Sequence, residues 1–102
     1  MRELIELVVK KKASDLHIAV GLPPVLRVDG KLIQTEYECL GPEDTKALIY
    51  SILTLEQKKT LEQKLELDCS YGVEGLGRFR VNVYKDRNGY AAALRTITSK
   101  IP

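Results

Sequence analysis

The chain of 102 residues is poor in the side chains that build disulfide frameworks and metal centres, because it has only two cysteines and one histidine. It also lacks tryptophan. Cys39 and Cys69 lie far apart and form no CxxC pair, and no signal peptide precedes them. The number and spacing of the cysteines favour two reduced, buried thiols in a cytoplasmic setting over a disulfide scaffold. His17 cannot complete a recognisable metal-ligand spacing with such cysteines, so we predict no metal site.

Long apolar runs and an excess of one charge are also lacking. Sixteen basic and fourteen acidic residues leave a formal net charge of +2, which excludes a strong field for nucleic acid or an acidic membrane. No apolar run approaches the roughly 20 residues that span a bilayer. The five tyrosines are scattered and form no basic-aromatic platform for single-stranded nucleic acid. We therefore expect no nucleic-acid partner and no membrane span.

The first half of the sequence predicts a helix, three strands and two more helices. Residues 1–12 carry apolar side chains at helical spacing, with lysines in the last turn, where cations favour the helix end. A strand is expected over 15–20, ending at Gly21-Leu22-Pro23-Pro24. Asp29-Gly30, between 25–28 and 31–34, is typical of a type I′ hairpin. Pro42 suits the start of one helix, and the capping box of Thr54 and Gln57 predicts another from Leu55.

From Leu65 the apolar period changes to two, which predicts three further strands. The first runs to Val73, glycines 72, 75 and 77 turn the chain, and the last strand follows a hairpin loop at 86–89. The order αβββααβββ predicts an α+β domain with a mainly antiparallel sheet of about six strands, covered by helices on one face. In the middle strand Phe79, Val81 and Val83 face inward, which sends Arg78, Arg80, Asn82 and Tyr84 to the opposite face.

A charged sheet face has an ordinary interpretation, because most such faces are simply solvated. Spacing alone does not assign the arginines a function. His17, beside Asp15, could also suggest a catalytic or metal role. A general base needs a substrate pocket, and no feature of the sequence indicates one. A structural or interface role is therefore favoured for His17.

Five short motifs, in order and over nearly the whole chain, carry a resemblance to a known family. The chain resembles the N-terminal, PAS-like domain of the type II/type IV secretion ATPases, and within that family the retraction motors of twitching motility. The motifs are Ala13-Ser14-Asp15-Leu16-His17-Ile18, Gly21-Leu22-Pro23-Pro24, Arg27-Val28-Asp29-Gly30, Gly77-Arg78-Phe79-Arg80-Val81-Asn82, and Ala93-Leu94-Arg95 before Ile101-Pro102.

The resemblance implies a PAS-like domain over 1–98 and, over 99–102, the start of a linker to a RecA-like ATPase domain. No G-x-x-x-x-G-K-[ST] loop occurs, because Gly30-Lys31 is followed by leucine. ATP and Mg²⁺ are therefore expected in a longer parent protein and not in this chain. The family also implies a cytoplasmic homohexamer, peripheral at the inner membrane through the pilus machinery, in which this domain moves over the motor core.

The resemblance further implies that arginines of this domain reach nucleotide on the motor core. Arg80 and Arg95 match that role best. Arg78 and Arg27 lie in matching motifs, but each could instead be an ion-pair partner of Asp29, Asp68 or Glu74. The motif positions with an expected interface role are Ser14, Asp15, His17, Asp29 and Gly30. A small PAS-like ligand sensor or protein-interaction module without motor function stays open as the alternative.

Overall fold

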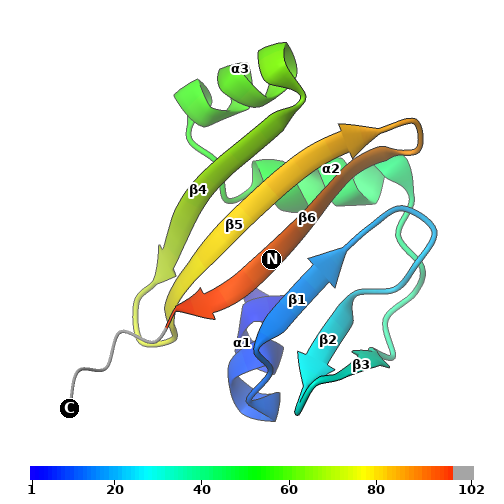
Figure 1. Ribbon diagram of the computed structural model, residues 1–102, viewed down its shortest axis with the longest axis vertical. Coiled ribbons are helices and arrows are strands. Elements are labelled where there is room, and N and C mark those ends of the chain that lie inside the picture. The colour runs from blue at the N-terminus through cyan, green and yellow to red at the C-terminus, as the bar shows by residue number, and fades with distance from the viewer. Residues whose placement is uncertain (98–102) are drawn as a thin grey trace.

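The structure, a computed structural model, describes residues 1–97; the predicted domain end at 98 and the predicted linker at 99–102 lie outside this range. The element order αβββααβββ is confirmed (Figure 1). Its elements are α1 (Arg2–Lys11), β1 (Asp15–Ile18), β2 (Val25–Val28), β3 (Lys31–Gln34), α2 (Pro42–Tyr50), α3 (Leu55–Lys64), β4 (Glu66–Val73), β5 (Gly77–Asp86) and β6 (Gly89–Ile97).

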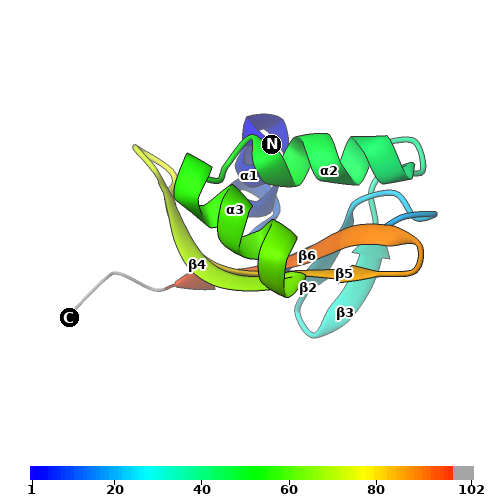
Figure 2. The same cartoon turned by 90° about the horizontal axis from the view of Figure 1, so that it is seen from above.

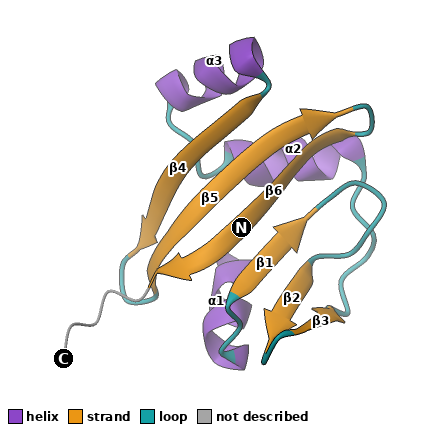
Figure 3. Cartoon of the chain, in the orientation of Figure 1, coloured by secondary structure: helices purple, strands orange, loops and turns teal. Residues whose placement is uncertain are grey.

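The strands form one sheet in the order β3-β2-β1-β6-β5-β4 (Figure 3). All neighbouring strands are antiparallel, as the sequence predicts. The centre of the sheet pairs β1 with β6, so that Asp15 lies opposite Arg95. This pairing closes the domain by joining its first strand to its last.

Helices α1 and α2 cover one face of the sheet, α3 stands at its edge beside β4, and no helix covers the other face (Figures 1 and 2). The core lies between the helices and the covered face. Helix α1 contributes Leu4, Ile5 and Val8. The strands contribute alternate residues that point to this side, namely Leu16, Ile18, Leu26, Phe79, Val81, Val83, Ala92 and Leu94. Full burial of a large apolar side chain stabilises by about 1.5–3 kcal/mol, so the two-residue period fixes which face the helices cover.

Two local predictions are confirmed by the backbone. Asp29 and Gly30 both have positive φ, 52° and 79°, as a type I′ hairpin turn requires. The Thr54 hydroxyl accepts a hydrogen bond from the Gln57 amide at 3.1 Å, and the Gln57 side chain accepts one from the Thr54 amide at 2.9 Å. Helix α3 therefore begins at the predicted capping box.

Other boundaries differ from the prediction. Strand β1 ends at Ile18 and not at Val20, because the Gly21 amide donates to the Leu40 carbonyl at 2.7 Å and draws the chain toward the segment before α2. Gly72 lies inside β4, paired with Arg78, and the turn is made by residues 74–76, with Gly75 at φ 82°.

The prediction of two buried thiols is wrong. Cys39 is exposed in the segment between β3 and α2, and Cys69 is half-buried on β4. Within residues 1–97, no helix is long and apolar enough to cross a membrane.

Candidate functional site

The open face of the sheet carries a continuous row of side chains that crosses all six strands. Register pairs Ser70 with Arg80, Arg80 with Arg95, Arg95 with Asp15, and Asp15 with Arg27, and Leu32 ends the row on β3. Three of the four arginines predicted from the sequence therefore lie in a single row. Arg78 lies in the neighbouring row, opposite Ile97.

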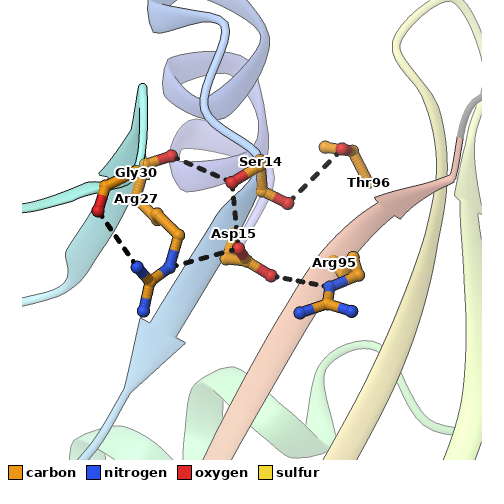
Figure 4. Close-up of polar contacts among 6 residues, drawn as sticks. All are labelled: Ser14, Asp15, Arg27, Gly30, Arg95 and Thr96. Carbon is orange, nitrogen blue, oxygen red and sulfur yellow. Dashed lines mark hydrogen bonds and ion pairs between the residues drawn. The ribbon is translucent and has the colours of Figure 1, made fainter.

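Asp15 is the carboxylate around which this row is organised (Figure 4). Its Oδ1 accepts a hydrogen bond from Arg95 Nε at 3.1 Å, and its Oδ2 accepts one from the Ser14 hydroxyl at 2.9 Å. Arg27 Nε lies 3.6 Å from Oδ2 and forms an ion pair. These groups leave the Asp15 side chain only 9% exposed, although it lies on the face that no helix covers.

The ionised form of Asp15 is favoured in spite of this burial. Loss of solvent raises the pKa of the carboxyl, but hydrogen bonds from Arg95 and Ser14 and the positive charge of Arg95 lower it more, so that the net pKa is below the usual value of 3.8. A carboxylate with two donors and a second guanidinium nearby stays charged at neutral pH. Asp15 is therefore a fixed negative charge among arginines.

The four arginines differ in how their guanidinium groups are occupied. Arg27 is held twice, by Asp15 and by the Gly30 carbonyl, which accepts from its Nη1 at 3.2 Å. Arg78 donates to the Ser70 hydroxyl at 3.4 Å and lies over Gly72. Among the described residues, Arg95 is held only through Nε, and its side chain is 76% exposed. Arg80 is exposed and makes no side-chain hydrogen bond or ion pair within residues 1–97.

This difference bears on the ion pairs suggested by the sequence. The partner of Arg27 is Asp15, and not Asp29, Asp68 or Glu74. Arg78 contacts a hydroxyl and not a carboxylate among the described residues. Within residues 1–97, Arg80 and Arg95 are the two of the four arginines whose terminal nitrogens have no partner, and they are the two that the resemblance favours for nucleotide.

Ser14 connects the row to the strands on both sides. Its amide donates to the Arg27 carbonyl at 2.8 Å on β2, and its carbonyl accepts from the Thr96 amide at 3.1 Å and from the Thr96 hydroxyl at 3.4 Å on β6. Sequence reasoning did not single out Thr96. The one feature of the sequence that pointed to Thr96 was its position next to Arg95. The hydrogen bonds between Thr96 and Ser14 depend on the register of β1 and β6, which the sequence does not reveal.

His17 follows Asp15 on the same face, opposite Ala93 on β6. Its Nε2 is buried and has no hydrogen-bond partner among the described residues. No group of three or more potential metal ligands occurs within residues 1–97. The site is thus a set of positive donors around one carboxylate, and such a set can bind and neutralise an anion.

The chain as a whole is similar to known secretion ATPases. No family model matches the chain. The type IV pilus retraction ATPase PilT of Pseudomonas aeruginosa is 43% identical over 99 residues, which are 97% of this chain and 29% of PilT. A crystal structure of the pilus retraction motor PilT with bound ADP superimposes with a TM-score of 0.90 at 40% identity, covering 98% of this chain and 29% of that one.

This chain matches the N-terminal domain of a PilT-like secretion ATPase. The ATPase DotB of Legionella pneumophila shares the fold, with a TM-score of 0.82 and 26% identity over all of this chain and 30% of DotB. The PilT-like chain described here thus spans less than a third of the length of the relatives that it matches. The predicted fold class is confirmed by the same comparison.

Proposed function

We propose that this chain is the N-terminal domain of a hexameric type IV pilus retraction ATPase and that it supplies arginines toward nucleotide bound on a RecA-like motor core. The observation that carries the proposal is the pair Arg80 and Arg95, which are opposite each other on the open face with their terminal nitrogens unoccupied among the described residues. The match to PilT, whose crystal structure holds ADP, supports the choice of nucleotide as the anion.

Guanidinium groups suit this role for a physical reason. Arginine stays charged at all relevant pH values, and its planar fork can donate two parallel hydrogen bonds to phosphoryl oxygens. Charge that develops on these oxygens during phosphoryl transfer is stabilised by such donors when they are already in position. Arg80 and Arg95 have that capacity. Arg27 has less of it, because its guanidinium is held at both Nε and Nη1.

In this proposal the chain does not hydrolyse ATP on its own. The ATP, the Mg²⁺ and the loop that holds the phosphates belong to the motor core of the parent protein, whereas this domain moves over the core and adds positive charge. The purified chain should show no magnesium-dependent ATP turnover above background. Turnover that copurifies with the chain and disappears on removal of magnesium would overturn this division of roles.

The partners proposed for the domain are its own motor core, neighbouring subunits of a homohexamer, and the pilus machinery at the inner membrane, with the motor on the cytoplasmic side. Since much of the ring contact would pair this domain with a motor core, the chain alone should be monomeric at micromolar concentration. Light scattering checks this expectation. A stable hexamer of the chain alone would contradict the proposed assembly.

The decisive test is ATP turnover of the gene product that contains both this domain and the motor core. Arg80→Ala should lower turnover strongly, and Arg80→Lys should restore little, because lysine keeps the charge but loses the fork. Arg87→Ala is the matched control, since Arg87 is also exposed but lies in the turn between β5 and β6. Unchanged turnover in Arg80→Ala and in Arg95→Ala would refute the nucleotide-directed role.

A ligand-sensing module is the alternative that the sequence left open. Such a sensor needs a cavity in its core. Phe79, Val81 and Leu94, which face the helices, are at most 2% exposed and belong to one packed cluster. This filled core weighs against an internal ligand.

A further inference from the structure

Asp15 and Arg95 form a contact that constrains only one end of the guanidinium. Asp15 Oδ1 accepts from Arg95 Nε, and no hydrogen bond occupies Nη1 or Nη2 within residues 1–97. A common arrangement of arginine with a carboxylate uses two parallel bonds and occupies part of the fork. Here the fork has no hydrogen-bond partner among the described residues, and Figure 4 shows Nε as the Arg95 nitrogen that a dashed line joins to Asp15.

The planarity of the guanidinium makes this single contact effective. Nε, Cζ and both Nη atoms lie in one plane, so directing the Nε–H bond at Asp15 narrows the range of directions in which the fork can point. An unrestrained arginine loses rotamer entropy when a ligand immobilises it. Asp15 removes part of that cost before any anion arrives.

Asp15 is itself held rigidly enough to act in this way. Its carboxylate is almost fully buried, Ser14 donates to Oδ2, and Arg27 closes the other side at 3.6 Å. Arg27 is in turn tied to the Gly30 carbonyl of the β2–β3 hairpin. The chain of contacts runs from the hairpin through Asp15 to Arg95 across three adjacent strands.

We propose that Asp15 is a positioning residue, which holds Arg95 through Nε so that the two Nη nitrogens face a phosphoryl group beside Arg80. This inference rests on the nucleotide-directed role proposed above and adds to it the residue that orients the fork. Asp15 itself does not touch the anion. Its negative charge would repel phosphate, and Ser14, Arg27 and Arg95 cover the carboxylate so that little of it is exposed on the open face.

The positioning can be measured in the chain without nucleotide. In ¹⁵N-labelled protein, solvent exchange of the Arg95 Nε–H proton should be slow, and Asp15→Asn should accelerate it about tenfold, which corresponds to the loss of one charge-assisted hydrogen bond. The Arg80 Nε–H signal serves as an internal control and should not change. Asp68→Asn is the matched variant, because Asp68 is an exposed carboxylate on the same face that accepts a hydrogen bond from Asn82 and contacts no arginine among the described residues.

A measurement on the unaltered chain covers the case in which Asp15→Asn does not fold. A scalar coupling across the hydrogen bond, from Arg95 Nε to the Asp15 carboxyl carbon, should be detectable. Ser14→Ala removes one donor to Oδ2 and should weaken that coupling without abolishing it. An absent coupling, or Arg95 exchange that is unaffected in folded Asp15→Asn, overturns the proposal.

The effect of this positioning on ATP turnover is tested in the gene product that includes the motor core. Asp15→Asn and Arg95→Ala should each lower the kcat for ATP, and the double variant should be no slower than Arg95→Ala, because both changes remove the same contact. If the fold-decreases in kcat of the two single variants multiply in the double variant, the positioning role is overturned. If Arg95→Ala is impaired and Asp15→Asn is not, the inference fails while the proposed function stands. If Arg80→Ala and Arg95→Ala both retain full turnover, the proposed function fails and the positioning role fails with it.

Discussion

Arg80 on β5 and Arg95 on β6 are direct cross-strand partners, with both side chains exposed on the face that the helices leave open. Like charges in such positions repel each other and destabilise the strand pair. Asp15 on the next strand contacts Arg95 but makes no ion pair with Arg80 among the described residues. The sheet therefore keeps a local repulsion that an anion bound between the two guanidinium groups would relieve.

The first prediction concerns the stability of the chain without nucleotide. Arg80→Ala should change the free energy of unfolding by less than about 0.5 kcal/mol, or raise it slightly, because the side chain is exposed and its neighbour is positive. Arg95→Ala should lower it by about 1 kcal/mol, since the buried Asp15 loses a donor. Urea denaturation with Arg87→Ala as a control measures the difference. Equal losses for Arg80→Ala and Arg95→Ala would contradict this account.

The second prediction concerns the pH dependence that Asp15 contributes. Its pKa in the folded chain is below the ordinary value of 3.8, so the ionised carboxylate stabilises the fold above that pH, and the contribution is lost as the pH falls through the lower, folded value. The difference in unfolding free energy between the unaltered chain and Asp15→Asn should therefore be constant near neutrality and shrink below about pH 4. Asp68→Asn is the control. A difference that stays the same down to pH 2 would argue against a charged Asp15.

The third prediction concerns the capping box of α3. Thr54→Ala should cost about 1 kcal/mol of stability, because the Gln57 amide loses its acceptor. Thr60→Ala is the matched control: Thr60 lies inside the same helix, and its hydroxyl donates to the Glu56 carbonyl, which the helix end does not depend on. Thermal unfolding of both variants separates the cap from a general effect of losing a threonine. A loss as large for Thr60→Ala would remove the special role of the cap.

The fourth prediction concerns thiol reactivity. Cys39 is exposed, whereas Cys69 is half-buried, and burial together with the nearby Asp68 raises the pKa of the Cys69 thiol. Since the thiolate is the reactive form, Cys39 should react with a maleimide faster than Cys69 at pH 7. Cys39→Ser should remove the fast phase and Cys69→Ser should keep it. Mass spectrometry of partly modified protein identifies the site, and initial labelling at Cys69 would contradict the structure.

The elements of this fold were predictable because their signals are local. The two-residue alternation around Phe79, the Asp29-Gly30 turn and the Thr54 capping box each depend on a few neighbouring residues. The organisation of the site was not predictable in the same way. Asp15, Arg27 and Arg95 come together through the β1–β2 and β1–β6 registers, and Asp15 and Arg95 are separated by 80 positions in the chain. Alternation alone could place Arg78 and Arg80 on one face, but it could not say which arginine the carboxylate would hold.

The last prediction is that the open face binds polyphosphate weakly and at one place. Arg80 and Arg95 present two guanidinium groups side by side, and Arg95 is already held at Nε, so tripolyphosphate should shift the Nε–H signals of these two arginines in NMR spectra. Without the motor core the affinity should be only in the millimolar range, about −4 kcal/mol of binding free energy, and it should fall as salt is added, because the groups are exposed. Arg80→Ala should abolish the shift at Arg95, and Arg87→Ala should leave it unchanged.

Lys46 and Lys58, which lie over the ring of Tyr50 on the helix side, provide a second positive region as a comparison. If their amide signals shift as much as those of the arginine pair, binding follows general positive charge, and the cross-strand arginines have no special affinity for phosphate.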